Sequence, residues 1–395
     1  MTARSRPRHP WTAAAVRLGL LAGRLARRLR LGAGGVIGGR VILALAPGAL
    51  SVLAAGRRVV LVSGTNGKTT TAHLIAAALR TRAAVVHNAT GANMPDGLVA
   101  ALAADRGAPY AVLEVDELYL GAVTEAVRPE VLVLLNLTRD QLDRGFEVQA
   151  VAASVSAAVS AHPDTLVVAN ADDLTVVGAV GECARTVWVA AGAGWQADVL
   201  GEPARPDPTW RADSRAVHGP HGRTPVSLAL PGQFNIGNAA MAMAAAGALG
   251  VPPDAAAAAA SRVTSIAGRY TKVHRGRHEL RLLLAKNPAG WTELLPILGT
   301  ASALLLVVNA ADADGRDTSW LWDVPFERLP GVPTVASGER AADLGLRLSY
   351  AGIEHRTAPD PLAGLELLPP GEVHVVANYT AFLRLRRRLT ARRAS

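Results

Sequence analysis

A run of nine residues, 63–71, constrains this chain more than any other feature, because it reads SGTNGKTTT and directly follows the apolar stretch 58–62. The stretch 72–79 that comes next is rich in alanine and leucine, which is typical of a helix. An apolar strand, a glycine-containing turn ending in Gly-Lys-Thr and a helix form the order of a phosphate-binding loop. In such a loop the backbone N–H groups and the start of the helix face the phosphates, because both carry partial positive charge.

Lys68 and Thr69 supply the two side chains that this chemistry needs. The Lys68 ammonium would reach the outer phosphates of a nucleotide, and the Thr69 hydroxyl would bind Mg²⁺. Lysine is rare in this chain, which contains only Lys68, Lys272 and Lys286 beside many arginines. The lysine at position 68 is therefore not a consequence of composition, and the run predicts a nucleotide site rather than a turn that merely ends a strand.

The length and composition of the chain indicate its fold class and exclude several kinds of site. A chain of 395 residues, half of them hydrophobic and few of them aromatic, is long enough for two or three α/β domains. The single cysteine, Cys183, excludes an internal disulfide and a zinc site of several cysteines, and we expect it to be a small buried residue. A net charge of +9 favours binding to an anionic surface. The sequence contains no basic motif with interleaved aromatic residues, so it does not predict nucleic acid binding.

The first 40 residues form a basic amphipathic segment in which arginine recurs every few positions. The arginines leave no uninterrupted span of about 20 apolar residues, so this segment predicts neither a membrane-spanning helix nor a signal peptide. We expect an amphipathic helix that either packs on its own domain or lies on an anionic membrane surface.

Continuous apolar stretches alternate with helical ones after the loop, which favours a mostly parallel sheet covered on both faces. Ligands bind such sheets at the carboxyl ends of the strands, so Glu114, Asn136 and the segment 170–173 are candidates for one site together with the loop. The expected strands are 83–86, 110–115, 131–136 and 165–170, and the expected helices are 150–161, 235–249 and 254–263.

The sequence also predicts the structure of two further regions. Residues 192–225 are rich in Pro, Gly, Asp and Arg without clear periodicity, so we expect an irregular surface segment there. A second α/β unit begins after Arg269, with expected strands at 279–285, 303–309, 332–336 and 373–378 and a closing helix at 380–388.

The loop and several later motifs resemble, in order, those of the Mur ligase superfamily, the ATP-dependent enzymes that build the stem peptides of peptidoglycan. The motifs are the loop itself, Glu114 within 113–117, and the segments 136–144, 170–173, 232–240 and 268–269. The resemblance implies a central P-loop ATPase domain with a mostly parallel sheet, followed by a smaller Rossmann-like α/β domain. It also implies that Thr69 and Glu114 bind Mg²⁺, that Asn238 contacts adenine, and that Arg269 is a hinge arginine. The implied ATP-binding residues are Gly64, Thr65, Asn66, Gly67, Lys68, Thr69, Thr70, Asn238 and Arg269.

Within this superfamily the chain is similar to the MurT-type subunits of lipid II isoglutaminyl synthase. Only 63 residues precede the loop, so we expect no domain of the kind that grips the UDP-linked precursor in ordinary Mur ligases. The motifs that resemble the MurT type are 88–94, 140–144, 286–290, 314–323 and 378–381. The implied domains are an N-terminal segment at 1–40, a central ATP-binding domain at 41–268 and a C-terminal domain at 269–395.

The MurT resemblance implies a reaction and a partner. ATP would convert the α-carboxyl of D-glutamate in the lipid II stem peptide to an acyl phosphate, and ammonia from a GatD-type glutaminase subunit would then form D-isoglutamine. The resemblance implies a location in the cytoplasm. The N-terminal segment is also compatible with a location at the inner face of the cell membrane. Three departures limit the resemblance. Gln141 replaces a histidine that helps hold a second magnesium, and Leu283 stands near the place of an aspartate that contacts the nucleotide. The four cysteines of a zinc ribbon are absent from 192–225, so no zinc is expected.

The C-terminal motifs supply three candidate catalytic residues. Lys286 is either close to the acyl phosphate or a solvated lysine at a strand end. Asp317 and Asp323 flank Trp320 and Trp322, which we expect to be core tryptophans beside a capped turn. By resemblance, Asp323, and after it Asp317, would reach the partner's Cys–His pair and orient its histidine.

Two other functions remain open at this stage. A stand-alone ligase of the Mur or folylpolyglutamate type would join an amino acid to a carboxylate without glutamine or a second subunit. A nucleotide-binding scaffold would regulate a partner without catalysis, although the intact loop and Glu114 argue against it.

Overall fold

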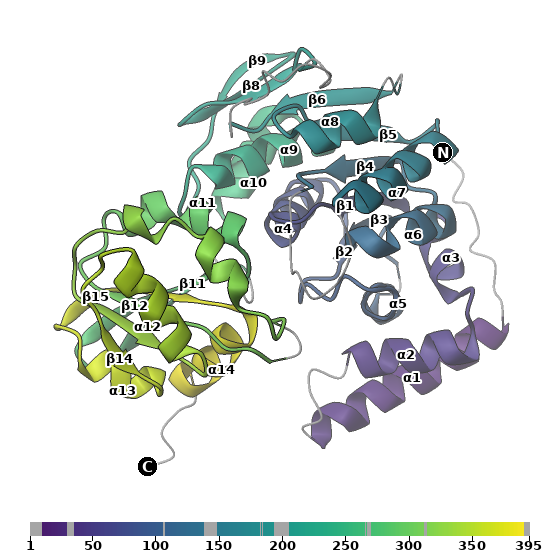
Figure 1. Cartoon of the computed structure of the whole chain (residues 1–395). Helices are drawn as coiled ribbons and strands as arrows, with labels where there is room; N and C mark the ends of the chain where they lie inside the picture. The colour runs from purple at the N-terminus through teal and green to yellow at the C-terminus, as the bar shows by residue number, and fades with distance from the viewer. Residues whose placement is uncertain are drawn as a thin grey trace. The chain divides into compact units, whose positions relative to one another are not determined.

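The computed structural model describes residues 10–29, 35–105, 107–137, 148–181, 183, 185–192, 205–264, 266, 270–311 and 314–390. The chain forms two compact units (Figure 1). The first contains the described residues up to Ala229 together with Gln233–Thr264, and the second contains Leu230–Gly232 and the described residues from Ile266 onward. The domain boundary expected at 268/269 lies outside the described residues and stays a prediction.

The first unit is built on a nine-stranded sheet in the order β2-β3-β1-β4-β5-β6-β7-β8-β9. Neighbouring strands are parallel from β2 to β7, and the pairs β7–β8 and β8–β9 are antiparallel. The strands are β1 (Arg58–Ser63), β2 (Val85–His87), β3 (Tyr110–Glu114), β4 (Val131–Leu134), β5 (Leu166–Asn170), β6 (Thr186–Ala190), β7 (Trp210–Ala212), β8 (Ala216–Gly219) and β9 (Gly222–Pro225).

Helices cover both faces of this sheet, which explains why its strands are continuously apolar. Alternate residues of β1 face opposite cores: Val60 and Val62 lie in one, and Val59 and Leu61 lie in the other. Residues of α4 (Lys68–Leu79), α9 (Phe234–Ala248) and α10 (Pro253–Ser261) belong to the first core. The second core contains residues of α3 (Ala49–Ala54), α5 (Pro95–Ala104), α6 (Leu120–Val127), α7 (Val148–Ala161) and α8 (Leu174–Val180).

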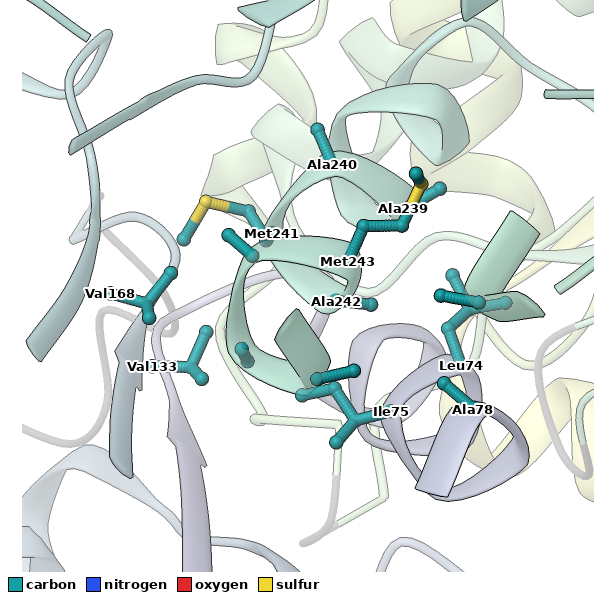
Figure 2. Packing of buried hydrophobic residues seen from close by; sticks show 14 of the residues in the cluster. Leu74, Ile75, Ala78, Val133, Val168, Ala239, Ala240, Met241, Ala242 and Met243 are labelled. Atoms are coloured by element: carbon teal, nitrogen blue, oxygen red, sulfur yellow. The ribbon is translucent and has the colours of Figure 1, made fainter. Parts of the chain in front are cut away.

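The alanine- and methionine-rich helix α9 lies at the centre of the first core. Figure 2 shows Met241 beside Val133 and Val168 of the sheet, and Leu74 and Ile75 of α4 on another side of α9. Small alanine side chains let α9 approach both the sheet and α4 closely. Full burial of Leu74 and Ile75 is worth about 1.5–3 kcal/mol for each side chain, which anchors α4 and hence the loop before it.

The N-terminal segment forms two helices, α1 (Pro10–Arg28) and α2 (Gly35–Leu45), which lie side by side (Figure 1). Their backbones approach closely at Gly19 and Gly38: a Cβ on Gly38 would lie 2.7 Å from the Gly19 carbonyl oxygen. The expected amphipathic helix is therefore present as α1. None of the described helices has both the length and the apolar character that a membrane span requires.

The prediction of an irregular segment at 192–225 is wrong for 210–225, where β7, β8 and β9 extend the sheet. These strands have three or four residues each, and β8 and β9 are joined by a two-residue loop with Gly219 paired to Gly222. This edge of the sheet is partly solvated, so polar residues occur on both faces of the strands and the sequence does not show the alternation of apolar and polar residues that indicates a strand. Thr224 and Val217 nevertheless face inward and are buried. The sequence analysis also missed β6.

The second unit contains a six-stranded sheet in the order β10-β11-β15-β12-β13-β14, parallel except for the antiparallel pair β10–β11. The four predicted strands correspond to β11, β12, β13 and β15, whereas β10 and β14 were not predicted. The strands are β10 (Tyr270–Arg275), β11 (His278–Leu284), β12 (Leu304–Val307), β13 (Thr334–Ser337), β14 (Arg356–Ala358) and β15 (Gly371–Ala377). The helices are α11 (Pro288–Leu298), α12 (Ala341–Tyr350), α13 (Pro361–Glu366) and α14 (Tyr379–Thr390), with short 3₁₀ helices at Ser319–Asp323 and Phe326–Arg328; a third, at Glu117–Tyr119, lies in the first unit.

Candidate active site

The loop between β1 and α4 has a backbone that only glycine fits at two positions. Gly64 has φ +136° and Gly67 has φ +81°, both in the region that side chains disfavour. A Cβ on Gly64 would lie 2.9 Å from both the backbone nitrogen and the carbonyl oxygen of Asn136, so the two chain segments touch through their backbones. The glycines therefore allow the loop to turn sharply against the end of β4.

Asn136 fixes the shape of the loop from this neighbouring strand end. The Thr65 N–H donates to the Asn136 carbonyl oxygen at 2.8 Å, and the Asn66 N–H donates to Asn136 Oδ1 at 2.8 Å. In return, Asn136 Nδ2 donates to the Asn66 carbonyl oxygen at 3.2 Å. Asn136, expected at the site from its strand-end position, thus holds the backbone that would surround the phosphates.

Lys68 is buried at the first position of α4 and is ion-paired. Its Nζ donates to the Thr65 carbonyl oxygen at 3.3 Å and to Glu117 Oε2 at 3.0 Å, and it also contacts the Gly64 carbonyl oxygen. Glu117 begins the 3₁₀ helix Glu117–Tyr119 and is 8% exposed. Glu117 was not predicted from the sequence, although its position three residues after Glu114 is a signal that could have indicated it.

Thr69 and Glu114 meet in a buried pair of oxygen ligands. The Thr69 hydroxyl donates to Glu114 Oε2 at 2.7 Å, and Glu114 is 2% exposed at the end of β3. A hydroxyl and a carboxylate are ligands that Mg²⁺ accepts, and Mg²⁺ is usually held by one or two carboxylates plus phosphate oxygens and water. The described residues contain no cluster of three His, Cys, Asp or Glu side chains that could hold a metal by itself. The pair thus fits a magnesium ion that arrives with nucleotide phosphates.

Asn88 orients the backbone of Glu114. Its Nδ2 donates to the Glu114 carbonyl oxygen at 2.8 Å, and its Oδ1 accepts from the Glu114 N–H at 2.9 Å. Asn88 directly follows β2, the edge strand beside β3, and is 4% exposed. This pair of hydrogen bonds holds the Glu114 backbone against the end of β2, and the Thr69 hydroxyl contacts the carboxylate itself.

Two histidines lie beside these residues. His73 Nδ1 is 2.8 Å from the Thr69 carbonyl oxygen, and the rings of His73 and His87 meet edge to face with their centroids 4.6 Å apart. Burial, helped by the charges of His73 and Arg80, lowers the pKa of His87 to about 3. His87 is therefore neutral at physiological pH, and Arg80 Nη2 donates to its Nδ1 at 3.2 Å.

Asn238 of α9, the predicted adenine contact, lies against the loop. A Cβ on Gly67 would lie 2.6 Å from Asn238 Oδ1, and the Thr71 hydroxyl donates to the same oxygen at 3.3 Å. Asn238 Nδ2 donates to Asn235 Oδ1 at 3.1 Å, which orients the amide. The first unit thus brings together the predicted residues Gly64, Thr65, Asn66, Gly67, Lys68, Thr69, Thr70, Glu114 and Asn238. Arg269 and the segment 138–147, which includes Gln141, lie outside the described residues.

The polar residues after β5 mainly support neighbouring backbone. Asn170 Nδ2 donates to the Leu135 carbonyl oxygen at 2.8 Å. Asp173 caps α8 by accepting from the Val176 N–H at 2.8 Å, and its other oxygen accepts from the Leu137 N–H at 3.2 Å. Burial raises the pKa of Asp173. These side chains connect the ends of β4 and β5 rather than adding ligands to the Thr69–Glu114 pair.

The candidate catalytic residues of the second unit lie in three different settings. Lys286 is half-buried between β11 and α11. Asp317 is exposed, and its Oδ1 accepts from the Ser319 N–H at 2.8 Å, an interaction that lowers its pKa. Asp323 is exposed at the end of the 3₁₀ helix Ser319–Asp323. The N-cap of that helix is Thr318, which makes no side-chain cap hydrogen bond, so the expected capped turn is not formed by the N-cap residue.

The expectation of two core tryptophans is correct for Trp320 and wrong for Trp322. Trp320 is 5% exposed, whereas Trp322 is 52% exposed. Trp322 stands beside Tyr350, with ring centroids 5.3 Å apart, and the Arg347 guanidinium lies 5.6 Å from the Trp322 ring centroid. The 3₁₀ turn places the two tryptophans two residues apart on different sides, so only one of them can face the core.

The MurT-like motifs 314–323 and 378–381 meet in a buried polar cluster, which the sequence analysis did not predict. Asn378 Nδ2 donates to the Asn309 carbonyl oxygen at 2.7 Å, and the Asn309 N–H donates to Asn378 Oδ1 at 3.0 Å. Asp314 Oδ1 accepts from the Thr380 N–H at 2.8 Å, and the Thr380 hydroxyl donates to its other oxygen. Burial raises the pKa of Asp314. The cluster ties the segment after β12 to the start of α14.

Comparison with known proteins follows the division into two units. Residues 62–246 match the Mur ligase middle domain, and residues 284–382 match the MurT ligase C-terminal domain. The chain is 28% identical to the subunit MurT of the lipid II isoglutaminyl synthase (glutamine-hydrolyzing) of Streptococcus pneumoniae, over 95% of this chain and 97% of that protein. It is 28% identical to the MurT subunit of Staphylococcus aureus, over 75% of this chain and 78% of that protein.

Solved structures support the same fold. The chain superposes on MurF from Acinetobacter baumannii with a TM-score of 0.71 at 18% identity, covering 89% of this chain and 80% of that one. It superposes on the folylpolyglutamate synthase of Mycobacterium tuberculosis complexed with ADP with a TM-score of 0.64 at 17% identity, covering 96% and 99%. The predicted two-domain α/β fold with mostly parallel sheets is confirmed.

Proposed function

This chain belongs to the MurT branch of the Mur ligase superfamily, and we propose that it is the ATP-dependent subunit of a glutamine-dependent amidotransferase that acts on lipid II. The observation that carries the proposal is the buried arrangement of Lys68, Thr69 and Glu114 around the loop, in a chain that matches a MurT subunit along nearly its whole length. The product would be an amide at the α-carboxyl of D-glutamate in the stem peptide.

The chemistry explains why such a reaction needs a phosphate-binding loop. A carboxylate is a poor electrophile, so one of its oxygens must first take the γ-phosphoryl group of ATP, which yields ADP and an acyl phosphate. Ammonia then attacks the acyl carbon, inorganic phosphate leaves with the carboxylate oxygen, and the nitrogen loses a proton. Charge develops on the transferred phosphoryl group in the first step, and the cationic side chain and N–H groups of a loop stabilise it.

We assign Lys68 to the outer phosphates and Glu117 to its positioning. The Lys68–Glu117 pair keeps the ammonium in the loop at 3.0 Å from a carboxylate, so a phosphate would compete with Glu117 for the same donor. The backbone N–H groups of the loop and the start of α4 add donors at the same place. The residues of the proposed ATP site are Gly64, Thr65, Asn66, Gly67, Lys68, Thr69, Thr70, Asn238 and Arg269.

We assign Thr69 and Glu114 as the protein ligands of Mg²⁺. When bound, the ion would neutralise charge on the β- and γ-phosphates. The Asn88 clamp holds the Glu114 backbone. Gly91 lies beside the pair without a side chain, and a Cβ there would be in van der Waals contact with the Thr69 hydroxyl oxygen at 3.6 Å, so glycine leaves that space free. The chain itself therefore supplies one hydroxyl and one carboxylate in a fixed geometry.

The proposed partner is a GatD-type glutaminase subunit, which releases ammonia from glutamine. MurT relatives are named as subunits, which supports an assembly of this kind. Asp323, and after it Asp317, would orient the catalytic histidine of the partner, and Lys286 would lie near the acyl phosphate. Replacing each aspartate by asparagine tests the first assignment, because glutamine hydrolysis by the assembled complex should fall for one of them, whereas unchanged hydrolysis in both would contradict it.

Lipid II is anchored in a membrane, so we place the protein in the cytoplasm at the inner face of the cell membrane. Reconstitution tests the whole proposal: the chain, a small glutaminase, ATP, Mg²⁺ and glutamine are incubated with lipid II, and the product is analysed by mass spectrometry. Conversion of carboxyl to carboxamide that requires both subunits is the expected result.

The folylpolyglutamate synthase likeness defines the second candidate function, a stand-alone ligase that joins an amino acid to a carboxylate. This alternative predicts product formation by the chain alone with a free amino acid and without glutamine. Nucleotide binding with no turnover under either condition would instead indicate a scaffold.

A further inference from the structure

The helix α1 exposes a stripe of large apolar side chains. Leu18, Leu21, Leu25 and Leu29 are between 53% and 59% exposed, and Trp11 is 76% exposed. In the order Trp11, Leu18, Leu21, Leu25 and Leu29, the intervals are seven, three, four and four residues. The first four side chains therefore lie on one face of α1, and Leu29, directly after the helix, continues that face. We call Trp11, Leu18, Leu21, Leu25 and Leu29 the apolar stripe.

The protein packs against a different face of α1. The buried residues of α1 are Thr12, Ala15, Gly19, Gly23 and Ala26, and a Cβ on Gly19 would lie 2.6 Å from the Gly38 carbonyl oxygen of α2. A helix that packs only on its own domain normally buries its large apolar residues and exposes its small or polar ones. In α1 the small residues face the protein, and the large residues face outward.

A row of arginines borders the apolar stripe. Arg17, Arg24 and Arg28 are exposed and spaced by seven and four residues, so they share one edge of the helix. No acidic residue occurs in α1, and the first acidic residue of the whole chain is Asp96. The outward surface of α1 is therefore apolar along its middle and cationic along one edge.

We propose that α1 lies flat on an anionic phospholipid surface, with the apolar stripe between the headgroups and acyl chains and with Arg17, Arg24 and Arg28 at the level of the lipid phosphates. An apolar face combined with a cationic edge is the pattern of a helix that binds in the membrane interface. Four arginines within α1 prevent it from spanning the bilayer, in agreement with the absence of a spanning helix among the described residues. A second copy of α1 would offer no acidic partner to these arginines, because α1 contains no acidic residue, so charge favours lipid over self-association.

A cavity beside α1 extends from the arginines of the helix to Asn88. It has a volume of about 500 Å³, and Arg24 and Arg27 line it together with Asn88 and Thr90. Asn88 is the residue that clamps Glu114. The inference deepens the proposed function, and only its statement about the substrate rests on that function. A substrate with a membrane anchor and anionic phosphates would pass from the lipid surface along the arginines toward the Thr69–Glu114 pair.

Vesicle binding tests the inference without ATP, glutamine or lipid II. The full chain is sedimented with vesicles of phosphatidylglycerol and phosphatidylcholine and, separately, with vesicles of phosphatidylcholine alone. We expect binding to the anionic vesicles that weakens at high salt, and at least tenfold weaker binding for the double variant Leu21→Gln/Leu25→Gln. The control is Leu346→Gln on α12, because Leu346 is 55% exposed and lies outside the stripe, and its vesicle binding should equal that of the unchanged chain.

A second measurement does not depend on the folding of the double variant Leu21→Gln/Leu25→Gln. Acyl-brominated phosphatidylglycerol should quench the fluorescence of Trp11, and the variant Trp11→Phe should lose that quenching. Absent binding to anionic vesicles, or equal binding by the stripe variant and the unchanged chain, would overturn the inference. A dimer that the stripe variant converts to a monomer, without vesicle binding, would identify the stripe as a contact between copies and also overturn it. Vesicle binding without any amidation of lipid II would refute the proposed function alone.

Discussion

Replacement of Gly67 by alanine tests how strictly the loop geometry is imposed. Gly67 precedes α4 with φ +81°, and a left-handed conformation costs an L-residue about 1–2 kcal/mol. The added methyl group would also lie 2.6 Å from Asn238 Oδ1, a distance at which one of the two groups must move.

The cost of that movement follows from the hydrogen bonds of Asn238. Its side chain accepts from the Thr71 hydroxyl at 3.3 Å and donates to Asn235 at 3.1 Å. Each such bond contributes about 0.5–1.5 kcal/mol to the free energy of unfolding. Loss of one bond plus the backbone cost gives a destabilisation of about 1.5–3.5 kcal/mol for Gly67→Ala.

Urea unfolding and ATP binding measure the two consequences. The matched control is Gly121→Ala in α6, where the nearest atom to a new Cβ is Ser154 Oγ at 4.0 Å and alanine should stabilise the helix by about 0.5–1 kcal/mol. We expect Gly67→Ala to lower stability and to weaken ATP binding at least tenfold, because the N–H groups of the loop are displaced. Unchanged stability together with unchanged ATP binding would refute the reasoning about the loop.

Three further predictions concern side chains in both units. Glu114→Gln should leave stability within about 1 kcal/mol, because an amide oxygen can still accept from Thr69, while ATP turnover falls and requires more Mg²⁺; an unchanged Mg²⁺ titration would contradict the ligand assignment. His87 has a folded pKa of about 3 against 6.5 when unfolded, so between these values the unfolded chain binds the extra proton and stability falls as the pH falls. From pH 7 to pH 5 this loss is about 2 kcal/mol, and denaturant unfolding of His87→Gln at both pH values should show a correspondingly smaller difference. Asp314→Asn should lower the melting temperature of the second unit, because an amide cannot accept from both the Thr380 N–H and its hydroxyl as a carboxylate does, and an unchanged melting temperature would show that the buried cluster does not need the charge.

The parts of the fold that the sequence predicted are those with strong local patterns. β1 and α4 were predicted because a strand buried on both faces is a continuous apolar run, and because the Gly-Lys-Thr sequence marks the turn between them. The helix α9 was predicted within one residue at each end, since fifteen residues of alanine-rich sequence admit little else.

The parts that were missed depend on tertiary pairing. β7, β8 and β9 are short, partly solvated strands whose residues gain β structure by adding to an existing sheet edge. The contacts of Glu117 with Lys68 and of Asn88 with Glu114 became recognisable only when the ends of β3, β1 and β2 were adjacent, since the partners are 49 and 26 residues apart in sequence. The outward face of α1 could be identified only once Gly19 and Gly38 were seen in contact.

The most direct test of the central claim is the mass of lipid II after incubation with the assembled complex, ATP, Mg²⁺ and glutamine, compared between variants. Lys68→Ala combined with Glu117→Gln removes the proposed phosphate contact without leaving a buried carboxylate unpaired. Lys272→Ala, at an exposed position of β10, is the matched lysine control. We predict amidation by Lys272→Ala at the rate of the unchanged complex and none by the Lys68 variant, although that variant still assembles with its partner. Amidation by the Lys68 variant at the unchanged rate would contradict the assignment of the ATP site.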